Sequence, residues 1–117
     1  MRQPPIVQEI LETGDIEQLL ERVRDVGVAC AMARMGDADP RALLKHLLDT
    51  AESYEGDPSS NRWMVLVGLI DVLADEVRNS DAPGDVSLAR RASALVAGAY
   101  SHHGSGHANR YLEDDES

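Results

Sequence analysis

The spacing of hydrophobic side chains along the chain is helical in five segments. Apolar residues recur three and four positions apart within residues 6–11, 16–33, 40–54, 59–78 and 85–99. This is the period of a helix with one side turned towards a core. Glycines and Asp-Pro pairs separate the segments, as expected for short connections between helices. The pattern predicts five helices joined by short loops.

Capping residues mark the expected starts of these helices. We expect the carboxylate of Asp15 to accept the backbone N–H of Gln18 while the Gln18 side chain reaches back, as in a capping box. Asp39–Pro40 and Asp57–Pro58 each place a capping residue directly before a proline, which is favoured in a first helical turn. These signals predict helices that begin close to residues 16, 40 and 59.

The last helix and the segment after it differ in pattern. We expect Asp85 or Ser87 to cap the helix, whose helical period is lost from Ser101 onwards. Glycines and terminal acids then predict a disordered tail. The sequence therefore predicts an all-α protein: a compact bundle of about five helices over residues 1–100, followed by a flexible, acidic, histidine-containing tail over residues 101–117.

Two segments are apolar on more sides than one buried face requires. Residues 26–33 and 63–70 are almost uninterrupted hydrophobic runs. A buried strand is the alternative for 63–70, but the helical period continues through Val77 and no convincing second strand exists to pair with it. A small bundle cannot easily cover so much apolar surface, so we expect the surplus in an interface between two copies or with another protein. The candidate interface residues are Val28, Ala29, Met32, Trp63, Met64 and Val67.

Composition and charge limit the classes of partner. With one Trp, three Tyr and no Phe, the core must be aliphatic. The formal net charge of −10 repels nucleic-acid phosphates, and Arg90–Arg91 is the nearest approach to a basic patch. Residues 40–78 allow a helix-turn-helix reading, but its second helix begins with apolar residues instead of base-reading side chains. Direct nucleic-acid binding is therefore not expected, although an acidic inhibitor of a nucleic-acid-binding protein stays open.

Cysteine usage and hydropathy indicate where the protein acts. The single cysteine, Cys30, excludes an internal disulfide and fits a reducing compartment. Its apolar neighbours predict a core side chain and not a reactive thiol. Residues 1–5 precede no signal-peptide core, and the longest apolar run is too short to span a membrane. We expect a cytoplasmic protein, and ten Arg against one Lys favour a high-GC or salt-adapted genome, a phage or mobile element included.

Two groups of side chains are weak candidates for metal binding. His102, His103 and His107 could supply imidazole ligands, but the glycines between them make convergence entropically costly. Asp71 and Asp75 stand four residues apart, a spacing that permits a divalent cation or a pair of split pKa values. For both groups the favoured interpretation is a solvated surface, and we expect no metal and no cofactor.

One spacing is similar to a known catalytic pattern. Arg41 and His46, separated by four residues, resemble the Arg-to-His pattern of helical ribonucleases of the HEPN type. The resemblance covers two residues and implies that they would meet to polarise a phosphodiester. The alternative is that both belong to the polar face of their helix. The role of Trp63 also has two interpretations: it is either an exposed anchor for a partner or a side chain that covers the end of the bundle.

The scarcity of catalytic motifs favours a protein without enzymatic activity. The sequence has no glycine-rich phosphate loop and no serine–histidine–aspartate constellation. We expect a helical interaction module, an adaptor, subunit or regulator that self-associates through its apolar helices. The alternatives are the DNA-facing regulator or acidic inhibitor, and a small metal-dependent enzyme or helical ribonuclease.

Overall fold

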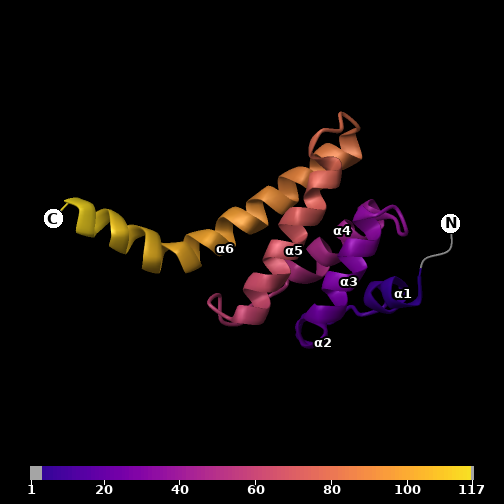
Figure 1. Cartoon of the computed structure of the whole chain (residues 1–117), viewed down its shortest axis with the longest axis horizontal. Helices are drawn as coiled ribbons and strands as arrows, with labels where there is room; N and C mark the ends of the chain where they lie inside the picture. Colours follow the sequence, from indigo (N-terminus) through magenta and orange to yellow (C-terminus); the bar gives the residue numbers. More distant parts are fainter. Residues whose placement is uncertain (1–3, 117) are drawn as a thin grey trace.

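The protein is built from helices alone in the part that its computed structural model describes, residues 4–116, with side chains from residue 4 to residue 101. Within that range there is no strand, which confirms the predicted all-α class and the helical reading of residues 63–70. The helices are α1 (Pro5–Leu11), α2 (Ile16–Glu21), α3 (Val23–Arg34), α4 (Pro40–Ala51), α5 (Asn61–Arg78) and α6 (Pro83–Glu116). Figure 1 shows their arrangement.

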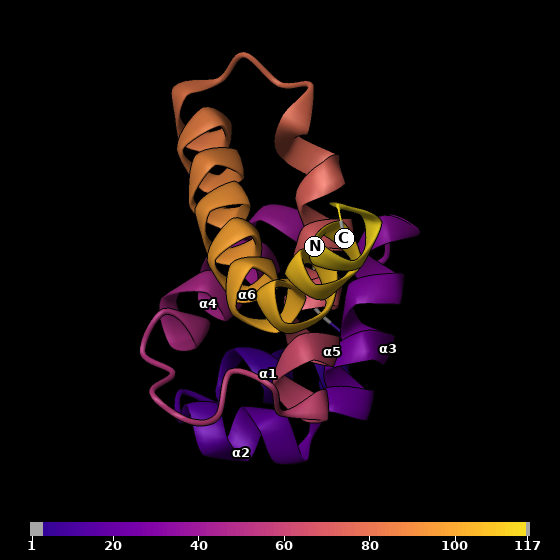
Figure 2. The ribbon, with the colours of Figure 1, turned by 90° about the vertical axis from the view of Figure 1, so that its left-hand side faces the viewer.

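Helix α5 is the centre of the bundle. It packs against α3, α4 and α6, with a smaller contact to α2. Helices α5 and α6 form an antiparallel hairpin, which stands out in Figure 2. In contrast, α3 and α5 run in the same direction, because Gly27 lies beside Leu69 and Arg34 reaches Glu76 seven residues further along both helices. Helix α4, which connects the parallel helices α3 and α5 in the sequence, therefore carries the chain back to the end of the bundle where α5 begins.

The core is aliphatic, as predicted. Leucine, isoleucine and valine supply the largest fully buried side chains, and Trp63 is the one aromatic residue among the buried ones described. The fully buried set is Val7, Ile10, Leu19, Val26, Leu43, Leu44, Leu47, Leu48, Leu66, Val67, Ile70 and Leu73. Every helix from α1 to α5 contributes to this list, so the five elements enclose one core.

The first two predicted caps differ in outcome. Asp39 accepts the backbone N–H groups of Arg41 and Ala42 and begins α4 as predicted. At α2 the capping box is wrong: the Asp15 carboxylate accepts from the N–H of Glu17 at 3.2 Å. Asp15 is the N-cap of α2 as predicted, but its carboxylate bonds the N–H two residues on, as in an Asx turn, and not that of Gln18.

The starts of α5 and α6 are also corrected. Asp57 caps a turn through the N–H of Ser59 at 2.9 Å, while Ser60 caps α5 through the N–H of Trp63. Helix α6 begins at Pro83, ahead of the predicted caps, so Asp85 lies inside its first turn. Proline is pre-organised for this position, since its missing N–H has no helical acceptor there.

The second predicted helix is divided in two. It breaks at Arg22, whose backbone (φ −106°, ψ 24°) separates α2 from α3 and gives six described helices instead of five. Arg22 contacts Asp25 and Glu9, so its side chain ties the break to α1. At its other end α3 stops at Gly36 as predicted. Gly36 has φ +89°, and the N–H of Asp37 donates to the carbonyl of Met32, which closes the helix end.

Helix α6 is longer than its hydrophobic period predicts. Its backbone continues past Ser101 to Glu116, so the disorder predicted for residues 101–117 is not confirmed. A glycine costs about 1 kcal/mol relative to alanine inside a helix and does not by itself end one. Across the described residues, no helix combines the length and the apolar character needed to cross a membrane.

Candidate interaction surface

The large hydrophobic side chains that remain exposed lie on three neighbouring helices. They are Val28 on α3 and Met35 at its C-cap, Val65 and Val72 on α5, and Tyr100 on α6. Met35 is 76% exposed and Val65 50%, followed by Val28 and Val72 at 45% and 40%. In both α3 and α5 the two residues are seven apart, which is two helical turns, so each pair points the same way. The exposed apolar surface is therefore ordered and not scattered.

The exposed residues of α3 and α5 belong to one continuous face. The buried side chains of both helices point to the common core, and α3 and α5 pack side by side in parallel. Their exposed sides consequently face solvent in the same direction. We call this surface the α3/α5 face and define it by Val28, Ala31, Met35, Val65, Gly68 and Val72.

Small residues lie in the middle of the α3/α5 face. Gly68 falls between Val65 and Val72, and a Cβ placed on it would meet nothing within 4 Å. Ala31 holds the equivalent place on α3 between Val28 and Met35. The helix backbone at Gly68 is thus open to close approach by another chain, with branched apolar side chains one turn to either side.

Charged side chains border this face. Arg62 is exposed at the beginning of α5, and Glu76 near its end lies 3.8 Å from the guanidinium of Arg34. Arg78 binds both Asp71 and Asp75, and these hydrogen bonds raise the pKa of its guanidinium. The face therefore has an apolar centre and a charged rim, the anatomy of protein–protein interfaces.

Of the two weak metal candidates, the structure describes the side chains of Asp71 and Asp75 only. Asp71 and Asp75 both bind the one guanidinium of Arg78 at the protein surface, which fits the favoured interpretation of a solvated surface. Groups of three or more histidine, cysteine or acidic side chains with metal-binding geometry are absent from the part of the chain that is described. His102, His103 and His107 lie outside the residues whose side chains the structure describes.

The structure places the predicted interface residues at three depths. Val28 is exposed, Met32 and Met64 are half-buried, and Ala29, Trp63 and Val67 are buried in the core. Sequence reasoning did not single out Met35, Val65 or Val72. The sequence could have indicated them, because it also has hydrophobic residues at positions of α3 and α5 that lie opposite the buried side.

Arg41 and His46 are held apart by separate partners. The Arg41 guanidinium binds Asp85 through Nε–Oδ1 at 2.7 Å and a second N–H–Oδ2 bond at 2.9 Å. His46 Nε2 lies 2.8 Å from the carbonyl oxygen of Thr13, which can only accept, so this nitrogen carries the proton. The pair does not converge on a common point, and the geometry favours the interpretation as two residues of the polar face.

A pocket of about 450 Å³ next to this ion pair contains three cationic side chains. Arg41 binds Asp85, Lys45 binds Asp49 at 2.9 Å, and Arg91 binds Asp49 and Glu52. The hydrogen bonds from Arg91 and Lys45 hold the pKa of Asp49 below its usual range. Because each cation already has a carboxylate, the pocket offers no spare positive charge for an anionic ligand.

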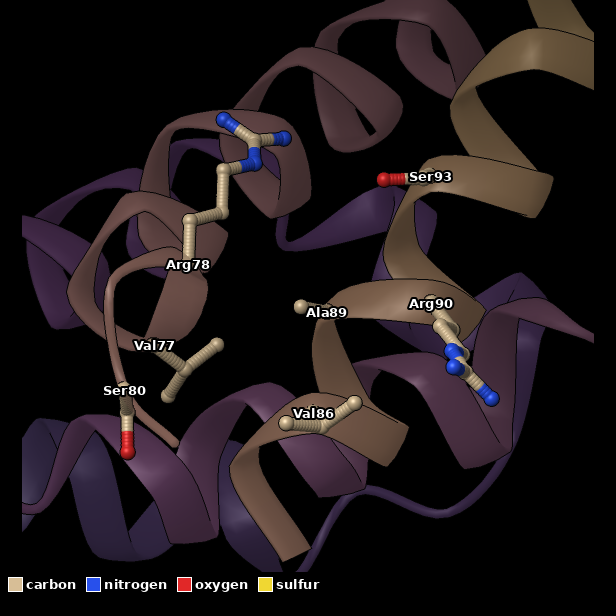
Figure 3. Close-up of a pocket in the computed structure, with 7 residues that line it drawn as sticks. All are labelled: Val77, Arg78, Ser80, Val86, Ala89, Arg90 and Ser93. Atoms are coloured by element: carbon tan, nitrogen blue, oxygen red, sulfur yellow. The ribbon is translucent and has the colours of Figure 1, made fainter. Parts of the chain in front are cut away.

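Figure 3 shows a second pocket, of about 300 Å³, where α5 ends and α6 begins. Val77 and Arg78 lie on one side of it, and Val86, Ala89 and Ser93 on the other. Its lining has no carboxylate, histidine or cysteine. It therefore has no carboxylate or imidazole that could act as a general base towards its serines, Ser80 and Ser93.

Trp63 packs on the end of the bundle. Its ring stacks on Tyr54 with centroids 4.1 Å apart and planes inclined by 14°, and Trp63 is buried. A groove of about 440 Å³ beside the pair is completed by the small residues Gly98 and Ala99 of α6. This position agrees with the interpretation that Trp63 covers the end of the bundle. Because the side chain is buried, it is not an exposed anchor for a partner.

Cys30 is the buried core side chain that its neighbours predicted. Burial raises the pKa of its thiol to about 12, against a smaller lowering effect from Arg34. A thiol that stays protonated at neutral pH is a poor nucleophile and a poor metal ligand. Cys30 therefore contributes packing and no visible chemistry.

The chain was compared with protein-family models, curated proteins and solved structures. The chain matches no protein-family model, no curated protein and no solved structure.

Proposed function

We propose that this chain is a non-enzymatic interaction module that binds another protein chain through its α3/α5 face. The observation that supports the proposal is the alignment of Val28 and Met35 with Val65 and Val72 on two parallel helices. Single exposed hydrophobic residues are normal on protein surfaces, but an ordered apolar patch with a polar rim is a mark of binding sites.

The chemistry of the remaining surface supports a binding role over catalysis. The three cations of the pocket beside the Arg41–Asp85 ion pair are already paired with carboxylates, and His46 and Arg41 serve separate contacts. The net charge of −10 opposes binding to nucleic acid. A protein partner is therefore the ligand class that this surface fits best.

The role as adaptor, subunit or regulator is tested by covalent capture. A photo-crosslinking amino acid at Val65 is compared with the same group at Gln18, an exposed position on α2 outside the face. We expect irradiation in host cells to give discrete protein adducts from position 65 and none from position 18. Equal adduct yields at the two positions would contradict the proposed function.

A further inference from the structure

The charges at the two ends of α5 are arranged in a self-complementary way. Val65 and Val72 are equally distant from the point between Gly68 and Leu69. Further out, Arg62 lies towards one end and Glu76 towards the other, with opposite charges at nearly equal distances from that point. A sequence that is apolar near the centre and oppositely charged at its two ends matches its own reversed copy.

We propose that the occupant of the α3/α5 face is a second copy of this chain, packed with α5 antiparallel to α5 of the first about a two-fold axis near Gly68. The inference rests on the proposed function and names its partner. In this register Val65 of one copy contacts Val72 of the other, and Arg62 approaches Glu76 on the same side of the pair. Both contacts occur twice, as two-fold symmetry requires.

Gly68 makes this approach possible. The position has open space where a side chain would be, so the two α5 backbones can come close at the axis. Val65 and Val72 are 50% and 40% exposed in one copy, and both would be covered by the other. Because α3 lies on the same side of α5 in each copy, Val28 and Met35 join the apolar surface that is removed from water.

Salt acts on two opposing electrostatic contributions to this association. Two copies, each with a formal charge of −10, repel one another at long range, and added salt screens that repulsion. Burial of the valines does not depend on screening. Between low and molar salt the long-range repulsion and the attraction of the exposed Arg62–Glu76 pairs therefore both weaken, while the burial of the valines remains.

The test uses charge reversal in the purified full-length chain. Arg62→Glu places two acids together across the axis, and Glu76→Arg places two bases together there. We expect each variant alone to dimerise roughly tenfold or more weakly than the unmodified chain, because two pairs turn repulsive. An equimolar mixture restores both pairs, so it should form a heterodimer with an affinity near that of the unmodified chain.

A matched pair of variants controls for overall charge. Arg90→Glu and Glu12→Arg make the same changes of charge at exposed positions outside the face, and their mixture should behave like each alone. The readout is molar mass by light scattering across a concentration series. A chain that stays monomeric overturns the proposal, as does a dimer that is unaffected by either reversal. Adducts to a different protein from position 65 alongside a monomeric chain would retain the proposed function and reject the second copy.

Discussion

Arg41 and Asp85, 44 positions apart in the chain, form a two-bond ion pair that joins the start of α4 to the first turn of α6. The Asp85 residue is almost fully buried while the Arg41 side chain is half exposed. The hydrogen bond from Arg41, assisted by one from Ser80, holds the pKa of the Asp85 carboxyl below its usual range. A carboxylate whose pKa is lower in the folded state than in the unfolded chain makes stability depend on pH.

Replacing Asp85 with Asn tests this linkage. The ion pair stabilises the fold above the unfolded carboxyl pKa of about 3.9 and is lost as the pH falls through the lower folded value. Asp85→Asn should therefore be less stable than the unmodified chain near pH 7, and the difference should shrink towards about pH 2.5. Urea denaturation at both pH values measures it. Asp81→Asn, an exposed neighbour, is the control, and a difference that does not change with pH would count against the linkage.

Two glycines predict opposite responses to the same substitution. Gly36 has φ +89°, where a side chain is strained, so Gly36→Ala should lower the free energy of unfolding by about 1–2 kcal/mol. Gly68 lies inside α5 with open space around it, so Gly68→Ala should raise that free energy by about 0.5–1 kcal/mol. Chemical denaturation of the dilute protein compares them. A loss of stability at Gly68 would mean that its surroundings are more crowded than described.

Two neighbouring positions on α5 separate core from surface. Ile70 is fully buried, and Ile70→Ala should cost about 2–5 kcal/mol of unfolding free energy. Val72 is 40% exposed, and Val72→Ala should change the same quantity by under about 1 kcal/mol in the dilute chain. Circular dichroism during urea titration gives both values. Comparable losses at the two positions would reverse the assignment of the α5 faces.

The buried thiol predicts slow chemical labelling. With its pKa raised to about 12, Cys30 should react with a disulfide reagent near pH 8 far more slowly than the same thiol in the unfolded chain. The increase in absorbance with and without denaturant measures both rates, and the unfolded chain is its own control. Equal rates would show that the thiol is exposed or that its environment opens readily.

The helices could be predicted because their signals are local. The leucine spacing of residues 40–54 and the glycine at 36 depend only on near neighbours in the chain. The break at Arg22 was not predicted, because the helical spacing of apolar residues continues across it from Ile16 to Ala33. The partner of Arg41 could not be predicted either, because the Arg41–Asp85 pair depends on α4 and α6 lying side by side.

The candidate surface was predictable only in part. The sequence indicated that residues 26–33 and 63–70 hold more hydrophobic side chains than the core can cover. It could not identify which of them remain outside, because that depends on the rotation of α3 and α5 about their axes. Val28 was among the predicted residues and is exposed, while Val65 sits in the same run and became visible only once the core direction was known.

The parallel course of α3 and α5 has a consequence for the electric field of the molecule. Each helix has a partial negative charge at its carbonyl end, and the carbonyl ends of α3 and α5 point the same way. Arg34 and Arg78 occupy the last turns of the two helices and offset that charge where it accumulates. In an antiparallel pair of copies, the N–H end of one α5 would lie beside the carbonyl end of the other. The two helix dipoles would then oppose one another, and the field at each end would be compensated by backbone as well as by arginine.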